Sequence, residues 1–360
     1  MDGNIFQLIW FLLVAVLFTG FLFLEGFDYG VGMLVPFAGK DDKERRIVIN
    51  SIGPFWDGNE VWLLTAGGAI FAAFPLWYST LFSKFYLALF LILVGLILRG
   101  VAFEFHSKSK NPKWRTCWDW AFSIGSFLPA LLWGVAVANL IRGVVLPTAE
   151  PLGQWSAATQ WGFFFSLLHP FCLLGGVVTF LLFLYHGACF LTLKVGDETV
   201  LARAKKIALR TGIILIPVTV LWVVYALFQT TILFSPNEAG EIALQPKWLA
   251  IITVALAAVA LLVSVFAQWK QKFGLAFVSV ALMIVFVTAT VFAIMFPNVL
   301  IFRNIPAASL NIYNASSSLY TLKIMTIVAA IFTPIVLLYQ IWNFWVFKKR
   351  VTNDPKDLVY

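Results

Sequence analysis

Charged residues are scarce in this chain, since Asp, Glu, Lys and Arg make up 12% of its 360 residues while hydrophobic residues make up 61%. A soluble globular domain carries about 25% charged residues, so this composition excludes that class. No polar stretch between the apolar runs is long enough to form a separate domain. The sequence therefore predicts an all-α integral membrane protein with one membrane domain over residues 1–360.

Histidine and cysteine, common ligands of haem and metals, are also rare, with three of each. His106 lies in a basic loop, while His169 and His186 are 17 residues apart in one apolar run, about 25 Å along a helix. One haem could not use both, so we expect structural histidines, no metal site, and haem ligands on another chain if the protein does redox work. The cysteines lack CxxC spacing and are expected to be small buried side chains. They are Cys117, Cys172 and Cys189.

Apolar runs long enough to cross a membrane recur along the whole chain, and nine transmembrane helices are expected. They are predicted at residues 5–34, 53–78, 80–104, 119–143, 161–193, 211–234, 248–268, 275–297 and 321–347. The first run is too long for the core of a cleavable signal peptide and lacks a basic flank, so it is predicted to be a retained helix. We expect two four-helix groups, within 1–143 and 161–297, and a peripheral ninth helix at 321–347.

Basic residues alternate between the loops in a way that predicts the orientation of the chain. Residues 40–46, 108–115, 194–210, 270–272 and 348–356 hold 19 of the 25 Lys and Arg residues. Because cytoplasmic loops retain positive charge, this distribution predicts a periplasmic N-terminus and a cytoplasmic C-terminus. Topology and anionic lipid headgroups also account for the net charge of +8, so nucleic-acid binding is excluded.

Seven ionisable residues lie in or beside the predicted spans, where each is costly in lipid. The predicted topology brings all seven to one level in the first four spans, toward the cytoplasmic side. Six carboxyl groups against one arginine cannot all be ionised comfortably, and groups that share protons can relay them. The sequence thus predicts a proton-handling cluster. Its members are Glu25, Asp28, Asp57, Glu60, Arg99, Glu104 and Asp119.

The acids of the first two spans are paired along the sequence. Glu25 and Asp28 are three residues apart, as are Asp57 and Glu60, so each pair is expected on one helical face. Glycines in the same spans are expected to let neighbouring helices approach closely. They are Gly26, Gly30, Gly32, Gly67 and Gly68.

Other interpretations of these residues remain open. Some acids, above all Glu60 and Glu104, fit equally as interfacial residues, helix caps or partners of Arg99. A secondary transporter with a buried carboxylate and arginine site is the main alternative function. Such transporters place their site between repeated halves, whereas here the second half lacks a matching set of acids. Trp56 and Trp62 flank the second acidic pair, and they either line the same cavity or simply pack.

Several motifs, in order along most of the chain, resemble subunit II of the cytochrome bd-type quinol oxidases. They are EGFDYGVG at 25–32, INSIGPFWDGNEVWL at 49–63, TAGGAIFAAFP at 65–75, RTCWDW at 115–120, GSFLP at 125–129 and NASSS at 314–318. The nine-helix topology with an external N-terminus agrees with this resemblance.

The resemblance implies a heterodimer in the bacterial inner membrane that oxidises quinol, reduces oxygen to water and generates a proton motive force without pumping. A related subunit I is expected to hold the haem b and haem d groups and the quinol site. Small single-helix accessory subunits are further expected partners, and a structural quinone is an expected ligand of this chain. A purely structural subunit without a proton role is a third interpretation.

The resemblance also assigns roles to individual residues. The expected proton path is Asp57, Glu25, Asp28 and Asp119, with Arg99 as the charge partner. Trp62 matches a position considered for an apolar oxygen route. Glu25 stands where the family often has Asp, and Glu60 replaces a frequent Gln; both changes preserve or add acidity, but they leave the members of the path open.

Overall fold

The computed structural model describes residues 2–145, 157–230, 234–236, 242–244, 247–352 and 354, and helices dominate this part of the chain. The helices are α1 (Asp2–Ala38), α2 (Asp42–Ile52), α3 (Trp56–Ala73), α4 (Pro75–Lys84), α5 (Tyr86–Phe105), α6 (Pro112–Arg142), α7 (Ala157–Leu167), α8 (Pro170–Lys194), α9 (Glu198–Gln229), α10 (Trp248–Trp269), α11 (Phe273–Met295) and α12 (Leu319–Val346), with 3-10 turns η1 (His106–Lys108) and η2 (Pro306–Ala308). Two antiparallel pairs complete it: β1 (Phe234–Pro236) with β2 (Ile242–Leu244), and β3 (Asn298–Leu300) with β4 (Leu310–Asn311).

Eight of the described helices are long and apolar enough to cross a membrane, which confirms the predicted all-α membrane class. They are α1, α5, α6, α8, α9, α10, α11 and α12. Each matches one of the nine predicted spans within several residues, although α9 begins well before the predicted 211–234 and α6 before the predicted 119–143.

The span predicted at 53–78 is wrong as a single helix, because the structure divides it into α3 and α4. Pro75 has no N–H to continue the helix, and it occupies the first turn of α4, where none is needed. Ser317 takes over part of the interrupted bonding, since its N–H donates to the Ala73 carbonyl (2.8 Å) and its hydroxyl to the Ala72 carbonyl (2.7 Å). The run predicted at 161–193 is likewise broken, into α7 and α8 before Pro170.

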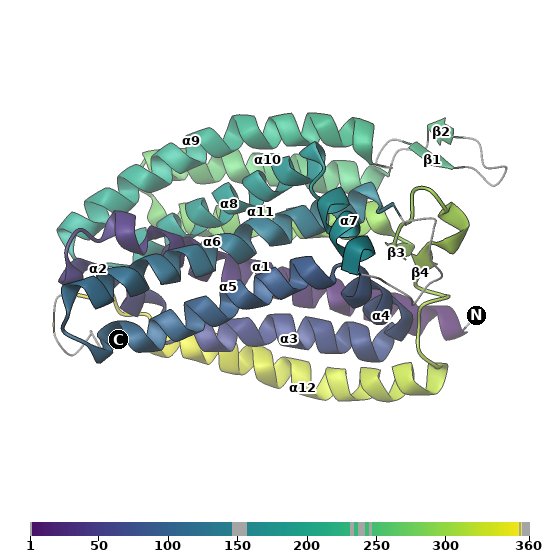
Figure 1. Ribbon diagram of the computed structural model, residues 1–360, viewed down its shortest axis with the longest axis horizontal. Coiled ribbons are helices and arrows are strands. Elements are labelled where there is room, and N and C mark those ends of the chain that lie inside the picture. The colour runs from purple at the N-terminus through teal and green to yellow at the C-terminus, as the bar shows by residue number, and fades with distance from the viewer. Residues whose placement is uncertain are drawn as a thin grey trace.

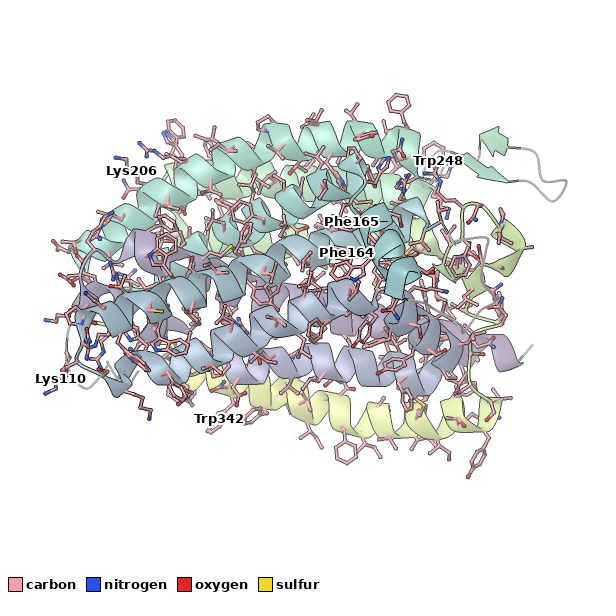
Figure 2. All side chains as sticks on the ribbon, viewed as in Figure 1. Lys110, Phe164, Phe165, Lys206, Trp248 and Trp342 are labelled. Atoms are coloured by element: carbon pink, nitrogen blue, oxygen red, sulfur yellow. The ribbon has the colours of Figure 1, made fainter. Side chains whose placement is uncertain are left out.

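The long helices run along one axis, and the N- and C-termini lie at opposite ends of it (Figure 1). Helix α1 packs against α3, α6, α8, α11 and α12, so it occupies the middle of the bundle. Lys110 and Lys206 lie at the end where the C-terminus is found (Figure 2), which we call the basic end. The division into two four-helix groups stays a prediction, since α1, α6 and α8 also contact one another closely.

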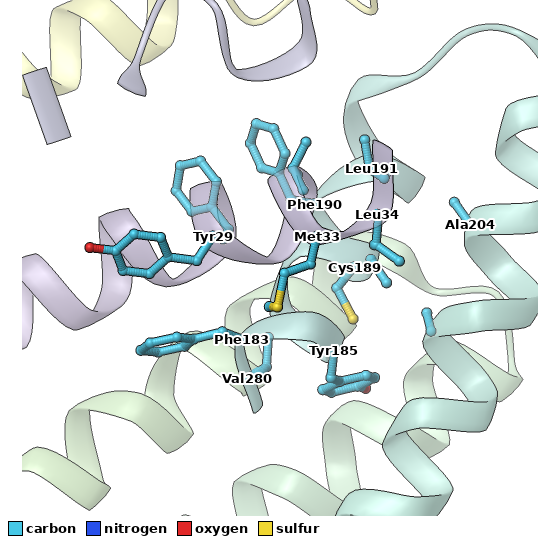
Figure 3. Packing of buried hydrophobic residues seen from close by; sticks show 14 of the residues in the cluster. Tyr29, Met33, Leu34, Phe183, Tyr185, Cys189, Phe190, Leu191, Ala204 and Val280 are labelled. Carbon is cyan, nitrogen blue, oxygen red and sulfur yellow. The ribbon is translucent and has the colours of Figure 1, made fainter. Parts of the chain in front are cut away.

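Glycine allows α1 and α8 to cross at backbone distance. A Cβ atom added to Gly30 would lie 1.9 Å from the Phe183 carbonyl oxygen, and one added to Gly187 would lie 2.4 Å from the backbone of Gly30. Buried side chains surround this crossing, including Tyr29 from α1 and Phe183 from α8 (Figure 3). The predicted packing role is thus confirmed for Gly30. An added Cβ at the predicted Gly67 or Gly68 would meet nothing within 4 Å in the described chain.

Ion pairs fasten α2 to its neighbours at the basic end. Asp42 accepts from Arg115 of α6, and Glu44 accepts from Arg203 of α9. The hydrogen bond from Arg203 is the main reason that the pKa of Glu44 falls to about 2. A carboxyl group with a lowered native pKa stabilises the fold above its unfolded pKa, and that contribution disappears as the pH falls through the native value.

We therefore expect the native chain to melt at a higher temperature than Glu44→Gln, with the full difference above about pH 5 and a progressively smaller one toward pH 2. This difference is measured on the detergent-solubilised proteins at several pH values between these limits. The matched control is Glu198→Gln, since Glu198 is exposed on α9 and the described structure shows no ion pair for it. A difference in melting temperature between the native chain and Glu44→Gln that stays constant down to pH 3 would contradict the stabilising role given to the ionised Glu44.

Candidate functional site

A buried arginine of one helix lies among carboxyl groups contributed by two others. Arg99 of α5 is 1% exposed; its Nη2 donates to Oε1 of Glu25 at 3.0 Å, and its Nη1 lies 2.9 Å from Oε2 of the same carboxylate. Nη2 also donates to Glu60 of α3, whose side chain is half-buried. The guanidinium lies over the ring of Tyr29, 4.8 Å from its centroid. One arginine thus joins α1, α3 and α5.

Asp28 belongs to the same site, one helical turn after Glu25 on α1. Both side chains are completely buried, as the three-residue spacing predicted for one helical face. We call Glu25, Asp28, Glu60 and Arg99 the Arg99 cluster. A single guanidinium cannot balance three carboxylates in a poorly hydrated interior, so we expect this cluster to hold protons as well as charge.

Two amide side chains extend the cluster, and the sequence analysis missed both. Nδ2 of Asn59, on α3, donates to Oδ2 of Asp28 at 2.7 Å, and Nε2 of Gln340, on α12, donates to Oδ1 of Asn59 at 2.9 Å. Asn59 is fully buried, and Gln340 is one of two buried residues on α12. An uncharged amide does not stand out in a pattern of ionisable residues. A Gln within an otherwise largely apolar run was the available clue.

Asp57 and Glu104 do not join the Arg99 cluster. Both are exposed in this chain, and Asp57 lies in the first turn of α3, where a carboxylate is favoured by the helix dipole. The ring of Trp56 stacks on Phe103, with centroids 4.8 Å apart. Trp62 is half-buried and packs against Gly20 of α1, where an added Cβ atom would lie 2.2 Å from the indole. Trp56 therefore packs against α5, and Trp62 packs against α1.

Asp119 forms a separate buried group with different partners. Its Oδ2 accepts from Arg45 of α2 at 2.7 Å, and its Oδ1 lies 3.0 Å from Nε2 of His106 in η1. Both Asp119 and His106 are almost completely buried. Asp119 thus ties α2, η1 and α6 together at the basic end. The predicted set of seven residues is divided among the Arg99 cluster, this group and the exposed pair Asp57 and Glu104.

The histidines do not fit as a haem-ligand pair in this chain. His169 precedes α8 and its ring accepts from the N–H of Phe171 at 3.2 Å, as a helix cap does. Nε2 of His186 donates to the Phe23 carbonyl at 3.0 Å, and the ring stacks on Phe277. Because His106 is paired with Asp119, each of the three histidines has a structural partner. Among the described residues, no three His, Cys, Asp or Glu side chains gather as metal ligands would.

The fold and this site define a multi-pass α-helical membrane protein with a buried carboxylate and arginine cluster. Residues 6–347 match the family model described as cytochrome bd terminal oxidase subunit II. The chain belongs to that family.

Relatives across the whole length support the assignment. The chain is 38% identical to cytochrome bd-I ubiquinol oxidase subunit 2 of Escherichia coli strain K12, covering 98% of this chain and 97% of that protein. It is 39% identical to cytochrome bd ubiquinol oxidase subunit 2 of Bacillus subtilis strain 168, covering 96% of each. A chain of the bd oxidase from Geobacillus thermodenitrificans has a similar fold, with a TM-score of 0.65 at 17% identity over 96% of this chain and 99% of that one.

Proposed function

We propose that this chain supports a related, haem-bearing subunit I and supplies protons to it from the cytoplasm, within a terminal quinol oxidase complex of the kind its family forms. Reducing one oxygen molecule to two waters consumes four electrons and four protons. Two quinols supply the electrons and release their protons. If uptake is cytoplasmic and release periplasmic, the reaction generates a membrane potential without a pump. The family does not favour the transporter interpretation.

The observation that carries this proposal is the Arg99 cluster itself. Glu25 and Glu60 share one guanidinium and Asp28 lies buried one turn from Glu25, so the three carboxyl groups form a proton reservoir. Arg99 lies six residues before the end of α5 at the basic end, about 9 Å by helical rise. In this proposal the basic end faces the cytoplasm. Protons enter at exposed Asp57, pass Glu60 one turn further along α3, and reach Glu25 and Asp28, with water bridging the gaps.

Asp119 has a supporting role in the proposed path. Its carboxylate is paired with Arg45 and His106, so it supports the path by holding α2, η1 and α6 at its cytoplasmic mouth, and it also remains a candidate member of the path.

The face of α3 and α5 that carries two exposed acids is our candidate contact with subunit I. Asp57 on α3 and Glu104 on α5 are exposed beside large apolar side chains such as Leu64, which is 73% exposed. Both acids lie at the basic end of their helices, and the exposed apolar side chains on the rest of this face require lipid or another protein to cover them. We propose that this face of α3 and α5 contacts subunit I, which holds the haem b and haem d groups and the quinol site. Single-helix accessory subunits are further candidate partners in the bacterial inner membrane.

An apolar groove between α1, α6, α8 and α9 is our candidate site for a structural quinone. Its volume is about 530 Å³, and Phe37, Trp120 and Phe127 are among the side chains that line it. The hydroxyl of Ser123, which also lines it, already donates to the Met33 carbonyl. The groove thus suits an isoprenoid tail. The oxygen route past Trp62 also stays part of the proposal, supported by the apolar packing of its indole against α1.

Neutral substitutions test the proton path. We expect Asp28→Asn and Glu25→Gln to lower quinol-dependent oxygen uptake by about 10- to 100-fold, and Asp57→Asn to lower it by a similar factor, while the haem absorbance spectrum of the purified complex is unchanged. Glu198→Gln is the matched control, since Glu198 is an exposed acid in the first turn of α9, outside the path and outside the face proposed to contact subunit I. Normal turnover in all three variants would leave a purely structural subunit as the better interpretation.

A further inference from the structure

A chain of side-chain hydrogen bonds connects Asp28 to the periphery of the bundle. It runs from Gln340 of α12 to Asn59 of α3 and on to Asp28 of α1, through bonds of 2.9 and 2.7 Å. Residues 281 positions apart in the sequence are thereby joined. All three side chains are buried, so water does not compete for these bonds and their direction is well determined.

The chemistry of the amide groups dictates the direction of this chain. An ionised carboxylate only accepts hydrogen bonds, so Asn59 has to turn its NH₂ group toward Asp28. Its carbonyl oxygen then points to Gln340, which has to present an NH₂ group in turn. Gln340 completes the chain by donating to the Asn59 carbonyl oxygen, so both ends of the Asn59 amide are satisfied when its NH₂ group faces Asp28. The α12 helix therefore supports the orientation of Asn59 that meets Asp28.

The consequence concerns the two oxygens of Asp28. Oδ2 is committed as an acceptor to Asn59, whereas Oδ1 is buried and has no hydrogen-bond partner in the described structure. A proton that joins this carboxyl group is therefore carried by Oδ1. The carboxyl also lies within the electrostatic field of Glu25, Arg99 and Glu60, so exchange with these other members of the Arg99 cluster has to involve Oδ1.

We propose that Asn59 and Gln340 are positioning residues that orient the Asp28 carboxyl group. Oδ2 then stays hydrogen-bonded to Asn59, and Oδ1 alone exchanges a proton. The orientation follows from the hydrogen bonds alone. Its importance for turnover rests on the proton path proposed above.

Contacts other than that of Gln340 attach α12 to the residues directly before α3. Phe344 stacks on Phe55 with ring centroids 4.4 Å apart, and Nδ2 of Asn343 donates to the Pro54 carbonyl at 3.3 Å. Most of α12 is otherwise exposed. An apolar side chain at position 340 would suit that environment better than an amide if attachment were its only role, and this makes a positioning role testable apart from assembly.

The test is infrared difference spectroscopy of the purified whole complex. The Asp28 band, either the C=O stretch of the acid or the stretches of the carboxylate, is identified as the one that Asp28→Asn abolishes. Loss of a hydrogen bond to the carbonyl oxygen raises the C=O frequency. We expect Asn59→Ala to shift the Asp28 band, and Gln340→Leu to shift it in the same direction by a smaller amount and to broaden it. Oxygen uptake should fall about two- to tenfold in both variants.

Asn343→Leu is the matched control, because it removes a neighbouring polar contact between α12 and the α3 region without touching the chain to Asp28. It should leave the Asp28 band and the oxygen uptake unchanged. An Asp28 band that stays at the native position in both Asn59→Ala and Gln340→Leu would overturn the proposal, as would an equal shift in Asn343→Leu. If Asp28→Asn turns over normally while Gln340→Leu shifts the band, the positioning stands and the proton path fails.

Discussion

Replacing Arg99 with leucine is expected to cause one of the largest losses of any single substitution in this chain. The change leaves Glu25 and Asp28 buried near each other without the guanidinium that Glu25 shares with Glu60. Removing one partner of a buried ion pair costs about 3–5 kcal/mol. We expect a much lower yield of haem-containing complex, and a lower melting temperature for what assembles.

A second variant separates charge from geometry at this position, and a substitution elsewhere serves as the control. Arg99→Lys keeps the charge but cannot reproduce the forked contact with Glu25 and the bond to Glu60, so we expect only partial recovery of yield. Arg115→Leu is the control, because its ion pair with Asp42 lies at the surface and such pairs contribute about 0–1 kcal/mol. Equal stability of the Arg99→Leu and Arg115→Leu complexes would contradict the role given to the Arg99 cluster.

Gly30→Ala is expected to prevent assembly, for a steric reason unrelated to charge. The added methyl group would lie 1.9 Å from the Phe183 carbonyl oxygen and 2.7 Å from the backbone nitrogen of Gly187. These are backbone atoms in the interior of α8, so the two helices have to separate. Overpacking a core costs about 1–3 kcal/mol when side chains can adjust, and a backbone clash is expected to exceed that range. Recovery of folded complex on size-exclusion chromatography measures the effect.

Gly274→Ala is the matched control for Gly30→Ala, because Gly274 is a helical glycine of α11 around which an added Cβ meets nothing within 4 Å. We expect a native yield, with a stability gain of up to about 1 kcal/mol from helix propensity. Gly187→Ala should reproduce Gly30→Ala, since it meets the same crossing from the other side. Normal assembly of both crossing variants would mean that α1 and α8 do not pack as described.

Hydropathy located the long helices well, since seven of the nine predicted spans correspond to single apolar helices and an eighth, 161–193, contains α8. It failed at residues 53–78, because a run of Gly, Ala and Phe stays apolar across the Phe74–Pro75 break, and a window average does not register a missing N–H. The predicted place of His169 inside a span was wrong for the same reason: Pro170 starts α8, and His169 caps it.

Helical spacing predicted the Arg99 cluster only in part. The pair Glu25 and Asp28 is buried on one face as expected, but Glu60 turns to Arg99 while Asp57 is exposed. Residues three apart on a helix differ by about 60° in direction, which suffices to put one of them outside a narrow interface. Spacing along one helix also carries no information about the partner on another, which is why Asn59 and Gln340 were not found.

The sequence by itself determined that this protein lies in a membrane, that it is all-α, and that its site contains acidic side chains. Scarce charge and repeated apolar runs require a bilayer, and acids placed in those runs require proton or ion partners. Only the tertiary structure decided which acids share a guanidinium, which are held by Arg45 and His106, and which stay exposed. The reason is physical: hydrophobic burial depends on composition along the chain, whereas ion pairs and hydrogen bonds depend on distances of about 3 Å between atoms of different helices.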